Sequence, residues 1–351
     1  MRSSDVAEVQ TAEVPTGHAE LGQAHNTSAG ALAAELPRAR ERSPRLANVE
    51  RLRLLAMFEI VAFHVGGAMS DAEERLPIIA GLGLPTFLLL NNAFNCTLSE
   101  RLGTKAFLQL KVTRLLLPWL IWSGVYASVV LLEKLRHDEP LSEAFSAWMI
   151  IGGTYTHLWF VPFALFGSLL IAWLQTRTQK VPHHLMALVM LVVGSVVVVV
   201  DALLLRAWQL DWPALQWLFA LPSPLLGFAL GRVVLANSRK LMRSAVWVLA
   251  AVAVVCVGLA LLSLAPEMVR RYAVSMALVS AAFLWPGRMD RFSLRVAPLL
   301  FGIYLTHPLV VRVYQASHLP MPPLPLLALL TFAVSAGVVE VMRRGPLRRL
   351  V

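Results

Sequence analysis

The chain has 351 residues, of which 57% are hydrophobic and 15% are charged. Soluble domains contain about 25% charged residues, so this composition excludes a water-soluble globule as well as a disordered chain. The formal net charge of +10 at pH 7 would indicate a nucleic-acid partner in a soluble protein, whereas a membrane protein gathers Lys and Arg in its cytoplasmic loops.

Residues 1–45 are rich in Ala, Glu, Ser, Thr and Gly and contain almost no large apolar side chains. Such a segment cannot bury enough apolar surface to offset the entropy that it would lose on ordering. We therefore predict a disordered cytoplasmic tail over 1–45, a membrane domain over 46–345 and a short cytoplasmic tail over 346–351.

From Leu54 onward, apolar runs long enough to cross about 30 Å of hydrocarbon as helices follow one another. The predicted spans are 54–70, 78–98, 115–132, 158–175, 185–205, 214–231, 245–265, 272–287, 296–311 and 323–342. The predicted fold is all-α: a polytopic transmembrane helical bundle of about ten spans, with both termini in the cytoplasm.

The distribution of basic residues agrees with this orientation. The predicted cytoplasmic segments hold every Lys and Arg except Arg75, Lys134, Arg136, Arg206, Arg270, Arg271 and Arg312. This bias follows the positive-inside rule, so the positive charge reports topology and predicts no nucleic-acid partner.

The first predicted span contains two ionisable side chains on one helix face. Arg53 stands at its cytoplasmic end, and His64 follows eleven residues later. In an α-helix this spacing places them about 20° apart in azimuth and about 16 Å apart along the axis. Arg can hold phosphate oxygens, and His can accept a hydroxyl proton near neutral pH, so a long phosphate-headed donor could lie along this face. Equally, Arg53 can be a topological charge and His64 a helix-contact residue.

Other polar residues within the spans have less specific interpretations. Glu59 lies about 140° around the helix from His64, so we expect it to pair with another span. Asn92 and Asn95 suit either a polar cavity or hydrogen bonds between helices. Asp201 lies near the end of its span, where we expect the carboxylate to reach water.

Four segments in a fixed order carry a family resemblance. They are Arg53-x10-His64, Lys111-Val-Thr-Arg114 followed by LLLPWLIWSGVY, HLWFV at 157–161 and FGIYLTHPLVV at 301–311. Over about residues 46–345 the chain resembles the membrane-bound acyltransferase 3 family, which transfers acyl groups from acyl-CoA to sugars and other envelope acceptors.

The resemblance implies roles for the residues at matching positions. Arg53 and His64 match the family's essential arginine and histidine, with the histidine as base or acyl-handling group. Lys111 and Arg114 match a basic pair that, with Arg53, would bind the donor. Contacts with the cavity or the acceptor are expected from Asn92, Asn95, His157, Trp159, Tyr304 and His307.

We therefore expect a membrane-bound O-acyltransferase that moves an acyl group, expected to be acetyl, from acyl-CoA to a hydroxyl of an envelope or lipid-linked saccharide. Acyl-CoA is the co-substrate, and no tightly bound cofactor or metal is predicted, because the sequence contains no H-E-x-x-H, no P-loop and no His/Cys cluster. The expected location is the bacterial cytoplasmic membrane, in contact with the lipid bilayer.

Two alternatives stay open. A proton-coupled transporter or exporter of a small polar or sugar compound would use His64, Glu59 and His307 as a relay. Such a protein is expected to contain matching broken helices in two internal repeats, and the sequence shows no matching halves. An inactive relative could instead act as a scaffold in envelope polysaccharide synthesis, because Leu54 and Asn92 depart from the family pattern.

Overall fold

The computed structural model describes residues 47–68, 81–208, 210–236, 240, 243, 267–285, 287–288, 290–317 and 319–351. Within these ranges the chain forms helices joined by short connections, without any β-strand, which confirms the all-α prediction. The predicted tail over 1–45 and the predicted span over 245–265 fall outside the described residues.

Each predicted span that the structure describes contains a helix, although the bounds differ by several residues. The helices are α2 (Ala47–Ala68), α3 (Gly83–Leu102), α4 (Thr104–Lys111), α5 (Leu117–Arg136), α6 (Met149–Gly152), α7 (Phe160–Arg177), α8 (His183–Ala207), α9 (Ala214–Ala220), α10 (Pro222–Leu235), α12 (Glu267–Leu284), α13 (Arg291–Val296), α14 (Leu300–Ala316) and α15 (Leu324–Arg344). A π turn, η2 (Val112–Leu116), joins α4 to α5, and short 3-10 turns occupy η3 (Leu141–Ala144), η4 (Ala297–Leu299) and η5 (Pro346–Arg349).

The third predicted span is longer than the sequence indicates. Gly103 separates α3 from α4 with a φ of 74°, a conformation that glycine adopts without steric cost. From there α4, η2 and α5 continue as one helical segment over Thr104–Arg136, whereas the apolar run alone predicts 115–132. The added N-terminal part is the amphipathic stretch that contains Lys105 and Lys111.

Among the described residues, six helical segments are long and apolar enough to cross a membrane. They are Thr104–Arg136, Phe160–Arg177, His183–Leu205, Ala214–Leu235, Arg291–Ala316 and Leu324–Arg344. Helices α2, α3 and α12 are long as well, but charged or amide side chains lower their hydropathy. The number of about ten spans and the side on which the termini lie therefore stay predictions.

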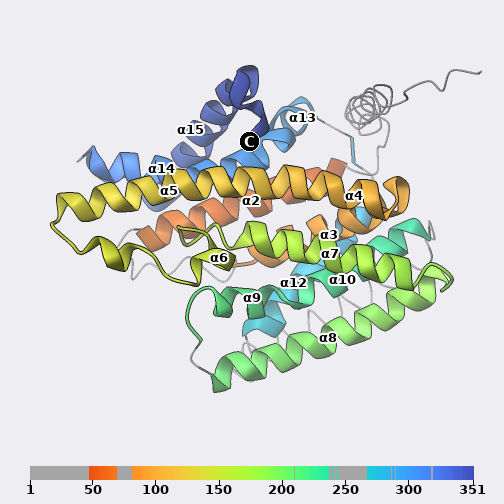
Figure 1. Ribbon diagram of the computed structural model, residues 1–351. Helices are drawn as coiled ribbons and strands as arrows, with labels where there is room; N and C mark the ends of the chain where they lie inside the picture. The colour runs from red at the N-terminus through yellow and green to blue at the C-terminus, as the bar shows by residue number, and fades with distance from the viewer. Residues whose placement is uncertain are drawn as a thin grey trace, which may run out of the picture. The chain divides into compact units, whose positions relative to one another are not determined.

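Helices α2 and α3 lie at the centre of the bundle. Helix α2 contacts α3, α12, α14 and α15, while α3 contacts α2, α7, α10 and α12. One apolar cluster gathers around Met57, Val61 and Ile303, and a second gathers around Leu89 and Val279. In Figure 1 α2 lies behind α5, and α8 runs along the edge of the bundle. Among the polar side chains of α2, Glu50 is thus buried, and Arg53 and Glu59 are partly buried.

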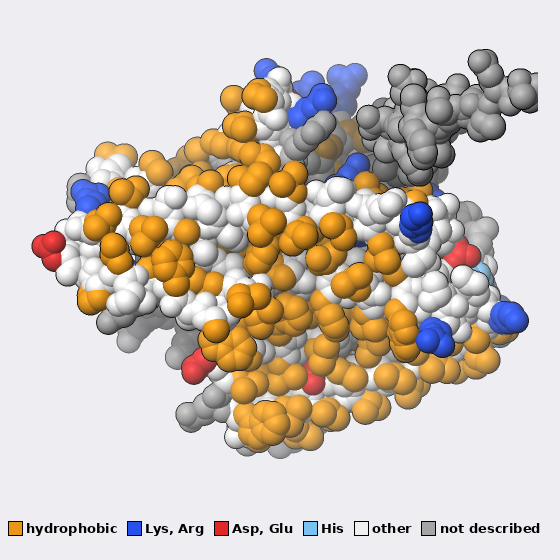
Figure 2. Space-filling model, viewed as in Figure 1, with side chains coloured by type: hydrophobic (Ala, Val, Ile, Leu, Met, Phe, Trp, Pro, Cys, Tyr) orange, Lys and Arg blue, Asp and Glu red, His pale blue; other side chains and the backbone are white. Residues whose placement is uncertain are grey.

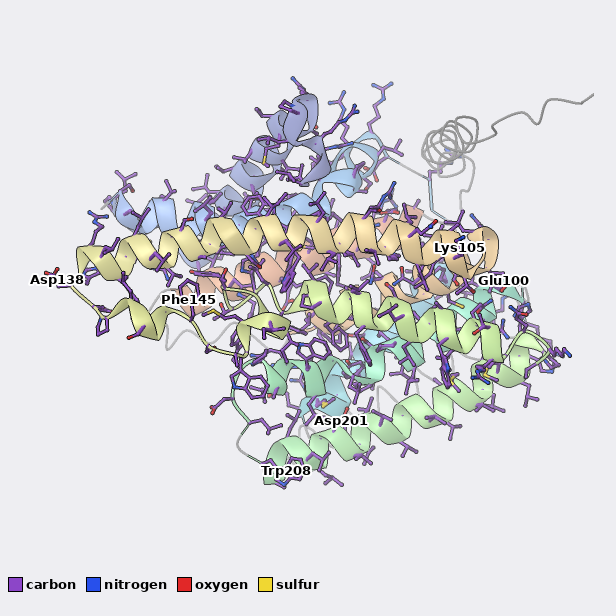
Figure 3. The ribbon with its side chains drawn as sticks, viewed as in Figure 1. Glu100, Lys105, Asp138, Phe145, Asp201 and Trp208 are labelled. Atoms are coloured by element: carbon purple, nitrogen blue, oxygen red, sulfur yellow. The ribbon has the colours of Figure 1, made fainter. Side chains whose placement is uncertain are left out.

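Helices α5 and α8 carry the outward apolar surface. The exposed side chains of α8 recur every three or four residues at Leu185, Leu188, Val192, Val196, Val199 and Leu203. Figure 2 shows apolar side chains over α5 and α8, with charged side chains mostly near the two ends. Figure 3 places Glu100 and Lys105 at one of these ends and Asp138 at the other. We call them the Lys105 end and the Asp138 end.

The expectation for Asp201 is wrong, because its side chain is buried rather than in water. The residue is 3% exposed and lies on α8, which packs against α10 and α12 (Figure 3). The apolar side of α8 faces outward, so its polar residue faces the neighbouring helices.

Helix α10 packs closely on α3, and two glycines make this contact possible. Gly227 and Gly231 are four residues apart, the small-xxx-small spacing that lets membrane helices approach each other. A Cβ on Gly227 would overlap Cβ of Asn92, and a Cβ on Gly231 would overlap Cβ of Cys96. The close contact keeps Asn92 within reach of the serine that it bonds on α10.

Replacing Gly231 by Ala should destabilise the bundle. The added methyl group has no space against Cys96, and overpacking of this kind costs about 1–3 kcal/mol. We expect a lower thermal midpoint for the detergent-solubilised protein. Gly337→Ala on α15 is the matched control, because a Cβ there meets nothing within 4 Å. Equal midpoints for the two variants would contradict this packing.

Candidate functional site

Three histidines from distant parts of the sequence meet near the Asp138 end of the bundle. His64 comes from α2, His157 from the connection before α7 and His307 from α14. The ring centroids of His64 and His307 are 5.2 Å apart, those of His157 and His307 are 5.5 Å apart, and those of His64 and His157 are 6.5 Å apart. Three histidines that are far apart in the sequence therefore form one cluster.

Pro308 fixes the protonation pattern of its neighbour His307. Because proline has no N–H, the carbonyl of Tyr304 lacks its usual helical donor. Nδ1 of His307 lies 2.8 Å from that carbonyl oxygen and 3.2 Å from the carbonyl oxygen of Ile303. A carbonyl can only accept, so Nδ1 carries the proton and Nε2 is left with its lone pair. His307 thus presents a hydrogen-bond acceptor or base from a buried position.

Tyrosines surround His157. The ring of Tyr126 lies 4.9 Å from the His157 ring, and those of Tyr155 and Tyr304 lie 5.5 Å and 5.4 Å away. The Tyr304 hydroxyl donates to the backbone carbonyl of His157, which holds this connection against α14. Nε2 of His307 is buried without a hydrogen-bond partner among the described residues. Buried nitrogens are normally satisfied, so an unpaired one is a candidate for contact with a ligand or for proton transfer.

A cavity of about 450 Å³ opens beside the histidines. Its lining comes from α2, from the connection before α7 and from α14, and comprises Phe63, His64, Gly67, Tyr155, Thr156, His157, Pro308, Val311, Arg312 and Gln315. His64 is half-buried, whereas His157 and His307 are buried. Among the three histidines, His64 is therefore the one most accessible to a molecule in the cavity.

Arg53 occupies the opposite part of α2. Its guanidinium donates to Oε2 of Glu50 at 3.2 Å and to the carbonyl of Ala297 at 3.3 Å. The charges of Arg53 and Arg114 both act on the ammonium group of Lys111, which also lies 5.5 Å from the ring centroid of Phe107. The structure thus brings the three predicted donor-binding cations together at the Lys105 end.

The π turn η2 accounts for the position of Arg114. It ends two residues before Pro118, whose missing N–H leaves the carbonyl of Arg114 without its usual α-helical donor. Helices widen into π turns at such interruptions, frequently at functional sites. The KVTR segment therefore adopts a local geometry that helical periodicity alone does not predict.

The face of α2 between the two groups is filled by protein. Met57 is fully buried and Ile60 is 6% exposed, and both belong to the apolar cluster that includes Ile303. Arg53 and His64 share a face, as the spacing predicts, but side chains of α14 and α15 pack against that face. A donor reaching from one to the other has to pass beside this contact or part it.

Three sequence candidates lie away from the cavity. Asn92 donates to Oγ of Ser223 at 3.3 Å, and Asn95 donates to Oγ of Ser168 at 3.2 Å, so both amides bond between helices. Trp159 is buried, with its ring 5.9 Å from that of Phe163. None of the three is among the residues that line the cavity. His157, Tyr304 and His307, in contrast, lie at the cluster.

Glu59 does not join the histidines. Its carboxylate accepts the backbone N–H of Gly83 at 2.7 Å and that of Gly81, at the start of α3. The prediction that Glu59 pairs with another span is confirmed, and its partner is a helix N-terminus. An anion at this end of a helix also interacts favourably with the helix dipole.

The sequence analysis missed part of the cavity wall. Arg312 entered it only as a basic residue outside the predicted cytoplasmic segments, and neither Tyr155 nor Glu133 was noted. The sequence does contain a signal for Arg312. This residue follows His307 on the same helix and lies four positions after Pro308, so it shares the helix face of Pro308. Among the described residues, no group of three or more His, Cys, Asp or Glu side chains could hold a metal ion.

Comparison with known proteins identifies the family. The sequence model of the acyltransferase 3 family, described as an acyltransferase domain, matches residues 46–340. No curated protein and no solved structure gives a match. The matched range covers most of the chain and includes all four segments that carry the resemblance, from Arg53 to the helix of His307. The protein is thus an integral membrane protein with six apolar helices of spanning length among its described residues, and it belongs to the acyltransferase 3 family of membrane acyltransferases.

Proposed function

We propose that this acyltransferase moves an acyl group, acetyl in the first instance, from acyl-CoA to a hydroxyl of an envelope or lipid-linked saccharide. The observation that carries the proposal is the half-buried His64 on the wall of a 450 Å³ cavity, with the unprotonated Nε2 of His307 nearby. The cavity has room for a sugar unit, and its wall combines aromatic rings with polar groups, as ligand sites commonly do.

In the proposed reaction His64 removes the proton from the acceptor hydroxyl. The oxygen then forms a bond to the carbonyl carbon of the thioester, the C–S bond breaks, and CoA leaves as the thiol after taking up a proton. Nε2 of His307 can accept a hydrogen bond from a protonated ring nitrogen of His64. That bond would direct the other nitrogen of His64 toward the acceptor, as an orienting partner does in other catalytic groups. The proposed function includes two routes. The acyl group can move directly from the thioester to the acceptor, or it can first form an acyl-enzyme.

The donor phosphates would bind at the Lys105 end, where Arg53, Lys111 and Arg114 concentrate positive charge. The pantetheine arm would extend along α2 toward His64, about 16 Å from Arg53 by helix rise. Because Met57 and Ile60 are buried between the two, this route requires α2 to separate slightly from α14. The expected setting is the bacterial cytoplasmic membrane, with the donor arriving from the cytoplasm.

The transporter alternative is less well supported. Its relay needs Glu59 near the histidines, and this carboxylate instead bonds to the first backbone amides of α3. Only an activity measurement distinguishes an inactive scaffold from the proposed enzyme.

Transfer of label from radiolabelled acetyl-CoA to lipid-linked saccharide in inverted membrane vesicles tests the proposal. Absence of transfer with acetyl and longer donors would reject it.

Replacing His64 by Ala should reduce transfer in this assay by about 10²–10⁴-fold, the usual contribution of a general base. The variant should still bind acyl-CoA, because the donor cations lie at the other end of α2. His184→Ala at the exposed start of α8 is the control and should keep full activity. A fully active His64→Ala enzyme at matched expression would remove His64 from the mechanism.

Replacing Arg53 by Ala should weaken donor binding. The loss of one charge-assisted hydrogen bond costs about 1.5–3 kcal/mol, so KM for acetyl-CoA should rise about ten- to hundred-fold. Steady-state kinetics at varied acetyl-CoA measure this, with the exposed Arg101→Ala on α3 as the control. If KM stays constant and only the thermal midpoint falls, Arg53 serves the Glu50 ion pair and not the donor.

Two substitutions of His307 test the roles of its two ring nitrogens separately. The amide nitrogen of His307→Asn can replace the Nδ1–H donor to Tyr304, but this side chain has nothing at the position of Nε2. We expect this variant to fold and to lose about 10²-fold in kcat. His307→Gln places an amide nearer the Nε2 position and should lose more stability than activity. Calorimetry and kinetics on both variants measure the difference, and full activity of His307→Asn would show that Nε2 has no part in the reaction.

A further inference from the structure

One stripe of α14 forms a wall of the cavity beyond the histidines. Pro308, Val311, Arg312 and Gln315 all line it, at the i, i+3, i+4 and i+7 spacing of one helix face. Arg312 therefore stands about 6 Å further along the axis than Pro308. Its side chain is 41% exposed, so it lies on the open side of the cavity.

Two neighbours hold the guanidinium of Arg312 in place. Nε donates to the Tyr155 hydroxyl at 2.8 Å, and Nη1 donates to Oε1 of Glu133 at 2.8 Å. The guanidinium carbon lies 5.6 Å from the Tyr155 ring centroid. Tyr155 is itself stacked on Tyr126, with ring centroids 4.7 Å apart. An arginine fixed in this way loses little conformational entropy when it binds a ligand.

The charge on the cavity wall is positive. Arg312 is the charged residue among those that line the cavity, and its partner Glu133 is not one of them. Nη2 of Arg312 makes no hydrogen bond to the described residues, whereas Nε and Nη1 are engaged. The guanidinium is therefore held through Nε and Nη1, and the Nη2 group stays available to donate to oxygen atoms of a ligand.

We propose that Arg312 determines acceptor specificity, by binding an anionic group, a carboxylate or a phosphate, carried by the acceptor saccharide near its reactive hydroxyl. This inference rests on the proposed function in one respect, since it takes the cavity as the acceptor site. The anionic oxygens bind the free donors of the guanidinium, and the sugar unit extends from Arg312 toward His64. A charge-assisted contact of this kind is about twice as strong as one to a neutral hydroxyl.

Direct binding to the purified full-length protein tests the proposal without any turnover. Isothermal titration calorimetry compares methyl β-D-glucuronide, glucose 6-phosphate and the neutral methyl β-D-glucoside. We expect one of the two anionic sugars to bind about ten-fold more tightly than the glucoside, and the better one identifies carboxylate or phosphate. Equal affinity for all three, or binding of none, would overturn the proposal.

Variants assign that preference to the guanidinium. Arg312→Gln should bind the three sugars with equal affinity, and Arg312→Lys, which keeps the charge but loses the fork, should retain part of the preference. Glu133→Gln leaves the guanidinium charged and should keep the preference. Arg344→Gln, which removes an exposed arginine paired with Glu340 on α15, is the matched control. If Glu133→Gln and Arg312→Gln lose the preference equally, the ion pair is structural and the proposal fails.

Acyl transfer in membrane vesicles keeps the two proposals apart. A preference for anionic sugars that depends on Arg312, in a protein that transfers no acyl group, would reject the proposed function and retain the anion site. Transfer from acetyl-CoA together with equal binding of charged and neutral sugars would support the proposed function and reject the role of Arg312.

Discussion

The burial of α2 among other helices is the constraint on which the remaining structure depends. This helix carries Glu50, Arg53, Glu59 and His64, and isolated charges of this kind are costly inside a membrane. The fold supplies a partner for most of them: Arg53 pairs with Glu50, and Glu59 accepts the first backbone amides of α3. Because α2 is enclosed by α3, α12, α14 and α15, the outward apolar surface is left to helices such as α5 and α8.

Two prolines adapt regular helices to the site. Pro308 leaves the Tyr304 carbonyl unbonded within α14, and that carbonyl fixes the tautomer of His307. Pro118 does the same for the Arg114 carbonyl, and the helix widens into the π turn that carries this cation. In both cases the absence of one backbone N–H produces a local irregularity next to a side chain of the candidate site.

The cations gather around Arg53 and the histidines around His64, toward opposite ends of α2. Positive charge at the Lys105 end suits a phosphate-rich donor, while the cavity near the Asp138 end combines histidines, tyrosines and a fixed arginine. The buried contact of Met57 and Ile60 lies between them. In the reaction proposed above, this arrangement would keep the water-soluble donor and the acceptor apart until the acyl group reaches His64.

The sequence by itself determined most of the described helices, their order and the places of Arg53 and His64 on one face of α2, because hydrophobic periodicity and the rise of a helix are local properties. It also indicated Arg53 and His64 through their spacing, and Lys111, Arg114 and His307 through the family resemblance of their segments. Only the tertiary structure decided that His157 and His307 join His64, that Asn92 and Asn95 bond between helices, and that Arg312 faces the cavity with Glu133 on its other side. These relations join residues far apart in the chain, and they depend on the rotation of each helix about its axis. In lipid that rotation is set by close packing, such as Gly227 and Gly231 against α3, and by proline-induced irregularities, neither of which a hydropathy pattern encodes.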